Sequence, residues 1–213
     1  KGYLQGIMQA QMKVYGYYFI EELLSKEIIE DMQHSLPLQP GNDSVESTEW
    51  LFAHYVIARK IANLERTSLL KSASEHFNTK LFTPNPTPEL PLIHNMGSVD
   101  YQRQMPYVFK NSAINLNISL RSIRSGIPLR CFDIMGCGGF LLSNYQGDFY
   151  EHFVPGEDLV LFESQEDFLN KCDYYLKHDN ERRQIAANGY GKVKEFHTYE
   201  VRLKEIFKVV FSK

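Results

Sequence analysis

The sequence predicts an α/β fold, in which a Rossmann-like parallel sheet is flanked by helices and preceded by a mostly helical N-terminal segment. Apolar residues recur at helical spacing through most of residues 1–77, whereas short apolar runs alternate with helical patterns over residues 78–213. Strands that alternate with helices over short connections are typical of a parallel sheet covered on both faces. We therefore expect a helical segment over 1–77, which links to or partly packs on a Rossmann-like domain over 78–213.

The N-terminal segment is expected to contain three helices. Helical periodicity runs over residues 4–24 and continues in a short second helix over 26–34. The polar stretch 39–43 contains proline and glycine and breaks the pattern. Ser44 or Ser47 can cap the third helix, which reaches to about residue 76.

The second part of the chain alternates expected strands with expected helices. The strands are expected at residues 80–83, 92–93, 114–118, 140–142 and 159–162. The helices are expected at residues 100–109, from Pro128 to about 137, and at 165–177, 181–193 and 198–211. Three prolines in residues 84–88 enforce an extended loop between the first two strands.

Residues 126–144 are the most informative part of this pattern. Pro128 suits the first position of a helix, and Gly138 and Gly139 permit the left-handed turn that ends one. The apolar run 140–142 then predicts a buried strand, which ends in a polar loop. Because ligands bind beyond the carboxyl ends of parallel strands, we expect a nucleotide site here.

Arg130 and Asp133 lie three residues apart near the start of the predicted helix, so both project from one face. An arginine offers a fork of donors to the oxygens of a diphosphate, and a carboxylate can accept both hydroxyls of a ribose. A simpler interpretation is that Asp133 complements the helix dipole and Arg130 pairs with it at the surface. The spacing alone favours neither interpretation.

Two further groups are candidates for ligand contact. Asn144, Tyr145 and Gln146 follow a buried strand and precede a helix that Asp148 can cap, so their backbone amides are expected to face the same crevice as Arg130. Turn geometry alone would also favour these residue types. His94 lies just past a predicted strand, where its ring can donate to a substrate oxygen or act as a base. A lone histidine in a loop more often makes a hydrogen bond within that loop.

Composition excludes several classes of function. A net charge of −3 without a basic run argues against nucleic-acid binding. The three cysteines lack a CxxC pair, and the histidines lack ligand spacing, so no disulfide and no metal site is expected. No signal peptide and no apolar run of about 20 residues are found, which predicts a cytoplasmic protein without a transmembrane segment. A nicotinamide-dependent oxidoreductase is disfavoured because the glycine fingerprint is absent.

Several motifs, in order, resemble the CgeB-like branch of group 1 glycosyltransferases. They are FKNSAINLNI at 109–118, GIPLRCFDIMGCGGF at 126–140 and FVPGEDLVL at 153–161. The later HDNERR at 178–183 and HTY at 197–199 resemble the closing helices of that family. The resemblance is specific because matches in this order seldom arise by chance.

This resemblance implies the GT-B architecture, in which two Rossmann-like domains face each other across a cleft. The chain would supply the C-terminal, nucleotide-sugar-binding domain, and the N-terminal domain of the same polypeptide would be missing. The implied reaction transfers sugar from a nucleoside-diphosphate sugar to an unknown acceptor, which is a glycan, a protein or a small molecule. No cofactor and no essential metal are implied, and the chain alone is expected to bind its donor without turnover.

The resemblance also assigns roles to residues. Asp133 takes the position of the carboxylate that holds the donor ribose in this family. The loop of Asn144, Tyr145 and Gln146 takes the position of the loop that contacts the sugar and the diphosphate. Arg130 is the first candidate for the phosphates, and Lys110 is the second. Ser125 stands eight positions before Asp133, where the wider superfamily often has a glutamate. This departure supports an alternative, that the chain is a non-catalytic GT-B-like interaction module.

Overall fold

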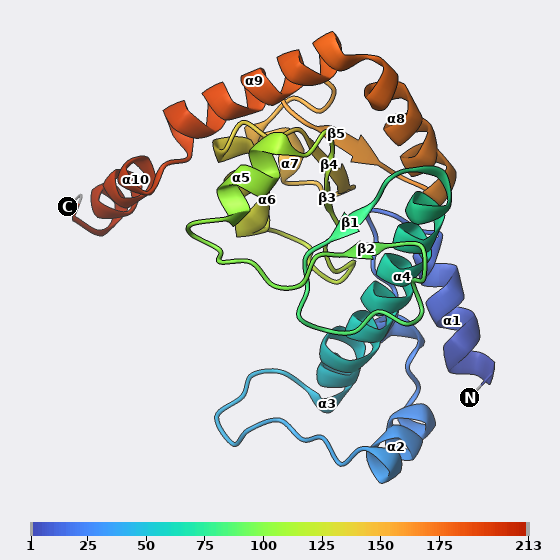
Figure 1. The fold of residues 1–213 in the computed structure, drawn as a ribbon. Coiled ribbons are helices and arrows are strands. Elements are labelled where there is room, and N and C mark those ends of the chain that lie inside the picture. The colour runs from blue at the N-terminus through green and yellow to red at the C-terminus, as the bar shows by residue number, and fades with distance from the viewer. Residues whose placement is uncertain (1, 212–213) are drawn as a thin grey trace. The chain divides into compact units, whose positions relative to one another are not determined.

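The computed structural model describes residues 2–211, which fold as two compact units whose elements are labelled in Figure 1. The first unit comprises the chain up to Thr79 together with Glu89–Ile93 and Ile118–Arg124. The second comprises Lys80–Pro88, His94–Asn117 and the chain from Ser125 on. Within the described residues, no helix combines the length and the apolar character that crossing a membrane requires.

The first unit is helical. Its elements are α1 (Gly2–Met12), a 3-10 turn (Glu21–Leu23), α2 (Lys26–Ser35), α3 (Thr48–Trp50), a π-helical segment (Leu51–Ile57) and α4 (Ala58–His76). The side chains of Ser25 and Ser47 accept hydrogen bonds from the first turns of α2 and α3, respectively. The expected cap at Ser47 and the expected end of the long helix at residue 76 are therefore confirmed.

The helix expected over 4–24 is wrong beyond Met12, where α1 ends. The buried side chain of Gln11 donates to the carbonyl oxygens of Val14 at 3.3 Å and Tyr17 at 2.8 Å. These bonds hold the chain in a loop where a helix would have continued, because a side-chain donor competes for backbone carbonyls.

Apolar side chains from these helices form the core of the first unit. The buried members are Ile7, Tyr18, Ile20, Leu24, Ile29, Phe52, Ala53, Ile57, Ala58 and Ile61. The hydroxyl of Tyr18 donates to the carbonyl of Ala53 at 2.5 Å, at the π-helical segment. This bond gives a partner to one polar atom that the core would otherwise leave unsatisfied.

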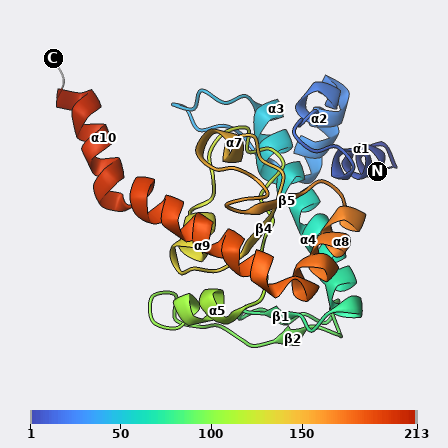
Figure 2. The ribbon, with the colours of Figure 1, turned by 90° about the horizontal axis from the view of Figure 1, so that it is seen from above.

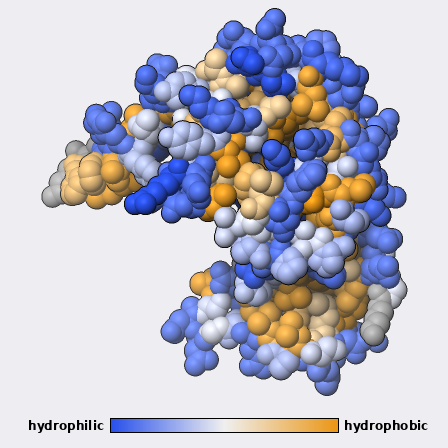
Figure 3. All heavy atoms as spheres, viewed as in Figure 1, coloured by the Kyte–Doolittle hydropathy of each residue, from blue (hydrophilic) through white to orange (hydrophobic). Residues whose placement is uncertain are grey.

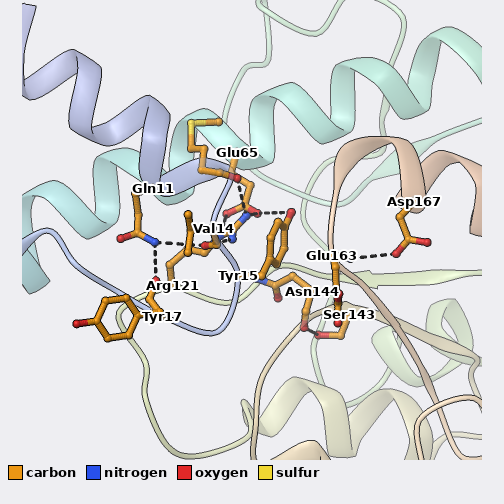
Figure 4. Close-up of polar contacts among 11 residues, drawn as sticks. Gln11, Val14, Tyr15, Tyr17, Glu65, Arg121, Ser143, Asn144, Glu163 and Asp167 are labelled. Carbon is orange, nitrogen blue, oxygen red and sulfur yellow. Dashed lines mark hydrogen bonds and ion pairs between the residues drawn. The ribbon is translucent and has the colours of Figure 1, made fainter.

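A buried triad of Arg121, Glu65 and Tyr15 joins the segment Ile118–Arg124 to the helices of this unit (Figure 4). Arg121 and Glu65 form an ion pair with 2.6 Å between Nη2 and Oε1, and their side chains are only 5% and 4% exposed. The guanidinium lies over the Tyr15 ring, 3.4 Å from its centroid. Both buried charges thus have close partners.

The second unit carries the strands. They are β1 (Lys80–Leu81), β2 (His94–Asn95), β3 (Asn115–Asn117), β4 (Leu141–Asn144) and β5 (Val160–Phe162). Its helices are α5 (Met105–Asn111), α6 (Leu129–Gly136), α7 (Phe149–His152), α8 (Gln165–Lys177), α9 (Asp179–Phe196) and α10 (Tyr199–Phe211). β1 and β2 pair in parallel, and a second parallel sheet has the order β3-β4-β5. The predicted α/β class, with parallel strands flanked by helices, is therefore confirmed.

Two predicted elements of this unit are shifted. β2 begins at His94, two residues after the expected start, because Ile93 donates its N–H to Leu90 in a turn at 3.1 Å. The helix expected from residue 100 begins at Met105 instead. The side chain of Asp100 accepts from the N–H groups that follow it and holds a turn in place of the first helical residues.

α9 packs against α6 through a close approach at Gly189. A Cβ atom at this position would clash with the carbonyl oxygen of Asp158 and would lie 3.2 Å from the sulfur of Met135 on α6. The core beneath consists of buried apolar residues. They are Phe109, Cys131, Ile134, Met135, Leu141, Phe149, Phe153, Leu159, Leu161 and Val193. The position of α6 therefore depends on a glycine that no larger residue can replace without a shift.

α10 differs from the other long helices of this unit because none of its described residues is buried. Figure 2 shows it leading away from the sheet beyond a bend after α9, and Figure 3 shows hydrophobic side chains on its surface. The exposed apolar residues are Tyr199, Leu203, Ile206, Phe207, Val209, Val210 and Phe211. Such a continuous apolar stripe exceeds what isolated surface residues present.

Candidate functional site

The loops that follow β3 and β4 meet at one edge of the three-stranded sheet. Because the strands are parallel, their carboxyl ends lie at the same edge, where α6 begins after β3 and where residues 145–148 follow β4. The N–H of Gly126 donates to Oδ2 of Asp148 at 2.5 Å and ties the two loops together. Gly126 has a φ of 97°, in the region that favours glycine.

This bond also corrects one expectation. Asp148 was expected to cap α7, but its side chain makes no cap hydrogen bond there and accepts from Gly126 instead. The carboxylate thus links two segments 22 residues apart. The segment before α6 and the loop after β4, which the sequence singled out separately, are brought together by it.

Arg130 and Asp133 project from the first turns of α6. Its core-facing side carries the buried residues Cys131, Ile134 and Met135, whereas Arg130 is exposed and Asp133 is half-buried. Both charged side chains therefore lie away from the hydrophobic interior. The partial positive charge of the helix start lies next to Arg130, the second residue of the helix, whereas Asp133 is one turn further along.

The structure adds a third residue, Tyr101, which the sequence did not single out. Its hydroxyl donates to Oδ2 of Asp133 at 2.5 Å. Partial burial of the phenol, followed by the hydrogen bond to Asp133 and its negative charge, raises the pKa of Tyr101 to about 12, while Arg130 acts in the opposite direction. Arg130, Asp133 and Tyr101 therefore form one surface triad.

The chemistry of the surface triad suits an anionic ligand that carries hydroxyl groups. The guanidinium of Arg130 presents several donors to phosphate oxygens, helped by the start of α6. The Asp133 carboxylate accepts hydroxyl hydrogens, and Tyr101 fixes one of its two oxygens.

The loop after β4 is more enclosed than expected. The side chains of Asn144 and Gln146 are buried, and Tyr145 is half-buried. The N–H of Tyr145 donates to the carbonyl of Phe162 at 3.2 Å, which extends the pairing of β4 with β5. This amide is therefore directed along the sheet rather than toward α6.

Lys110 and His94 are not brought to this edge. Lys110 lies in the last turn of α5, and the side-chain amide of Asn115 donates to the carbonyl of Phe109 at 2.9 Å. That bond places the end of α5 beside the amino end of β3, at the opposite edge from the start of α6. His94 is exposed on β2, in the separate two-stranded sheet.

The buried cysteines and the possible metal ligands of the described residues are further candidates for chemistry. Burial raises the pKa of Cys131 to about 12 and that of Cys172 to about 12, so neither forms a thiolate near neutral pH. Over residues 2–211, no group of histidine, cysteine, aspartate and glutamate could hold a metal ion.

The parallel sheet and its flanking helices are those of a Rossmann-like domain, and the fold matches that of a GT-B glycosyltransferase. The solved structure of sucrose-phosphate synthase from Thermosynechococcus elongatus is similar to this chain, with a TM-score of 0.56 and 14% sequence identity. The similarity covers 68% of this chain and 42% of that one. The chain therefore matches less than half the length of that protein.

A family model described as glycosyl transferase-like matches residues 59–208, which is more than half of the chain. The chain belongs to this glycosyl transferase-like family. No curated protein shows a significant match to the sequence.

Proposed function

We propose that the chain is the donor-binding part of a glycosyltransferase of the CgeB-like branch, and that it binds a nucleoside-diphosphate sugar. The observation that carries the proposal is the surface triad on and beside α6, the helix whose preceding segment is bonded to the loop after β4 through Gly126 and Asp148. The family match supports the same class of enzyme over residues 59–208. An N-terminal domain of the same polypeptide would supply the acceptor site.

In this proposal each part of the edge has a separate task. Arg130 binds the diphosphate, Asp133 accepts the ribose hydroxyls, and the loop at Asn144, Tyr145 and Gln146 lies beside the sugar. During transfer, the bond between the anomeric carbon and the diphosphate oxygen breaks, and the acceptor hydroxyl oxygen forms the new bond to that carbon. The diphosphate leaves with the bonding electron pair and takes up the proton that the acceptor hydroxyl loses. Arg130 and the start of α6 then stabilise the negative charge that develops on the departing diphosphate. No step in this scheme requires a metal ion.

A titration tests the proposal. We expect the protein to bind UDP, GDP or one of their sugars below millimolar concentration. Arg130→Ala and Asp133→Asn should each weaken binding by about tenfold or more, the loss of one charge-assisted contact. Arg183→Ala removes the same charge from α9, where the side chain is 76% exposed, and serves as the matched control without effect.

Isothermal titration calorimetry in the presence of EDTA measures these affinities directly. If the unmodified protein binds none of the ligands at millimolar concentration, donor binding is refuted. An equal loss of affinity in the Arg183 variant would show that general charge, rather than the surface triad, holds the ligand.

One observation favours a second function, a non-catalytic interaction module. Ser125 stands eight residues before Asp133, where a carboxylate would contact the donor sugar in the wider superfamily. Sugar transfer by the full-length protein, abolished by Asp133→Asn without loss of folding, would exclude this alternative.

A further inference from the structure

We propose that Tyr101 is a positioning residue, which holds the Asp133 carboxylate ready for a ribose and makes the site select ribonucleotides over 2′-deoxyribonucleotides. This inference rests on the proposed function, and it deepens that proposal by naming what the site distinguishes. Tyr101 lies in a turn that precedes α5, 32 positions before Asp133 in the sequence.

The contact between the two residues leaves acceptor positions of the carboxylate for a ribose. Tyr101 donates one hydrogen bond, to Oδ2 of Asp133. A carboxylate has about four acceptor positions on its two oxygens, so Oδ1 and the second lone pair of Oδ2 stay available to the two hydroxyls of a ribose. The phenol therefore orients the carboxylate without having to leave when the ligand binds.

The turn that carries Tyr101 is fixed by its own hydrogen bonds. Oδ1 of Asp100 accepts from the N–H groups of Gln102 at 3.0 Å and Arg103 at 2.6 Å. The N–H of Asp100 in turn donates to the side chain of Gln104 at 2.8 Å. A tyrosine on a closed turn has only two side-chain torsions left to order, so its hydroxyl is presented at low entropic cost.

Both ends of the contact are anchored in the same core. Met105, at the start of α5, packs on the buried cluster that also holds Ile134 and Met135 of α6. The phenol and the carboxylate therefore keep a defined separation. A carboxylate fixed in this way loses less freedom on binding a ribose than an unsupported one.

The two halves of a nucleotide report on different residues of the surface triad. The diphosphate, which faces Arg130, is identical in UDP and 2′-deoxy-UDP. The deoxy ligand lacks one hydroxyl, so it makes one bond fewer to Asp133. In this proposal the ratio of the two dissociation constants reports the bond between the 2′-hydroxyl and Asp133, so a residue that orients this carboxylate must change that ratio.

The test is Tyr101→Phe, which removes one oxygen atom and keeps the ring. Calorimetry should show that the unmodified protein binds UDP at least about fivefold more tightly than 2′-deoxy-UDP, the effect of one hydrogen bond to a charged group. The same comparison is made with GDP and 2′-deoxy-GDP. In the variant, the ribonucleotide should bind about three- to tenfold more weakly while the deoxy ligand changes less than about twofold.

Two controls separate positioning from a general structural role. Tyr107→Phe makes the same chemical change on α5, at a residue that is 70% exposed, and should leave both constants unchanged. The double variant Tyr101→Phe with Asp133→Asn should bind UDP no more weakly than Asp133→Asn alone, because Tyr101 acts through that carboxylate.

The outcomes are distinct for the two proposals. If the unmodified protein binds neither the uridine nor the guanosine nucleotides, the proposed function itself fails. If it binds them and Tyr101→Phe leaves the ratio unchanged, weakens both ligands equally or tightens the ribonucleotide, only the positioning role of Tyr101 is overturned. Additive losses in the double variant would overturn it as well.

Discussion

Each unit of the molecule contains a group of one arginine, one carboxylate and one tyrosine, yet the two groups have opposite surroundings. In the buried triad of the first unit, the ion pair is almost completely excluded from solvent. In the surface triad of the second, Arg130 and Tyr101 are exposed, and a hydrogen bond joins the phenol to the carboxylate. The same three functional groups therefore stand in two different environments.

The difference shows how burial decides what an arginine does. Nε and Nη2 of Arg121 donate to Glu65, and the nitrogens Nη1 and Nη2 also reach the carbonyls of Val14 and Met12 at 2.8 and 3.1 Å. Because every nitrogen of this guanidinium already donates to a protein acceptor, no pair of N–H donors is available to a ligand. The exposed Arg130 has that capacity, so only the surface triad is a candidate for binding.

The largest effect is expected from breaking the buried triad. Glu65→Ala should lower the free energy of unfolding by roughly 3–5 kcal/mol, because it leaves the Arg121 charge buried without its carboxylate. Asp133→Ala, the matched change in the surface triad, should cost less than about 1 kcal/mol. Urea unfolding followed by circular dichroism measures both. Equal losses would show that the two groups do not differ in the way that their burial implies.

A second experiment tests whether the surface triad stands on a rigid support. Gly189→Ala should destabilise the protein by about 1–3 kcal/mol, because the added methyl group clashes with Asp158 where α9 meets α6. Gly191→Ala, two residues along the same helix, places its methyl group in open space and should stabilise by about 0.5–1 kcal/mol. Opposite signs in thermal unfolding would confirm the close approach, and equal signs would contradict it.

The smallest effect concerns a polar group of intermediate burial in the second unit. Burial first, and then the charges of Arg202 and His152, lower the pKa of His197 to about 4. Its Nδ1 lies 2.6 Å from Nη2 of Arg202, and its ring stacks on Phe153. The folded state therefore keeps the ring neutral where the unfolded chain, with a pKa near 6.5, takes up a proton.

It follows that His197 costs no stability above pH 6.5 and an increasing amount as the pH falls from 6.5 toward 4. His197→Phe should abolish that part of the loss and raise the melting temperature at pH 4.5 by roughly 2–4 °C relative to the unmodified protein, after correction for their difference at pH 7. Identical pH profiles would show that the partly exposed ring is screened by solvent.

Much of the fold could be predicted from local patterns. The helix at residues 165–177 has the predicted bounds, because its periodicity, its Ser164 cap and its charged last turn all agree. The predicted end of the first helix is wrong because the side chain of Gln11 bonds to carbonyls further along the chain and closes a loop. Hydrophobic periodicity does not reveal such a bond. The predicted start of α5 is wrong because the Asp100 side chain bonds to the following N–H groups and holds a turn, although the helical pattern of the sequence continues through it.

The candidate site could be predicted only in part. Arg130 and Asp133 are three residues apart on one helix, so their common face follows from the helical period alone. Tyr101 and Asp133 are 32 residues apart, and Gly126 and Asp148 are 22 apart, so both bonds depend on how the chain folds over longer distances. The aspartate-led turn at residue 100 was a usable signal for an ordered loop, but it contains nothing that identifies the partner of Tyr101.

The path of the chain between its two units has a practical consequence for protein engineering. The segments Glu89–Ile93 and Ile118–Arg124 belong to the first unit, although the chain on either side of each belongs to the second. A truncation that starts after Thr79 would therefore carry both segments without the helices that enclose them. Arg121 would lose Glu65 as its counterion, so a separated second unit would expose a charge that the intact protein keeps buried and paired.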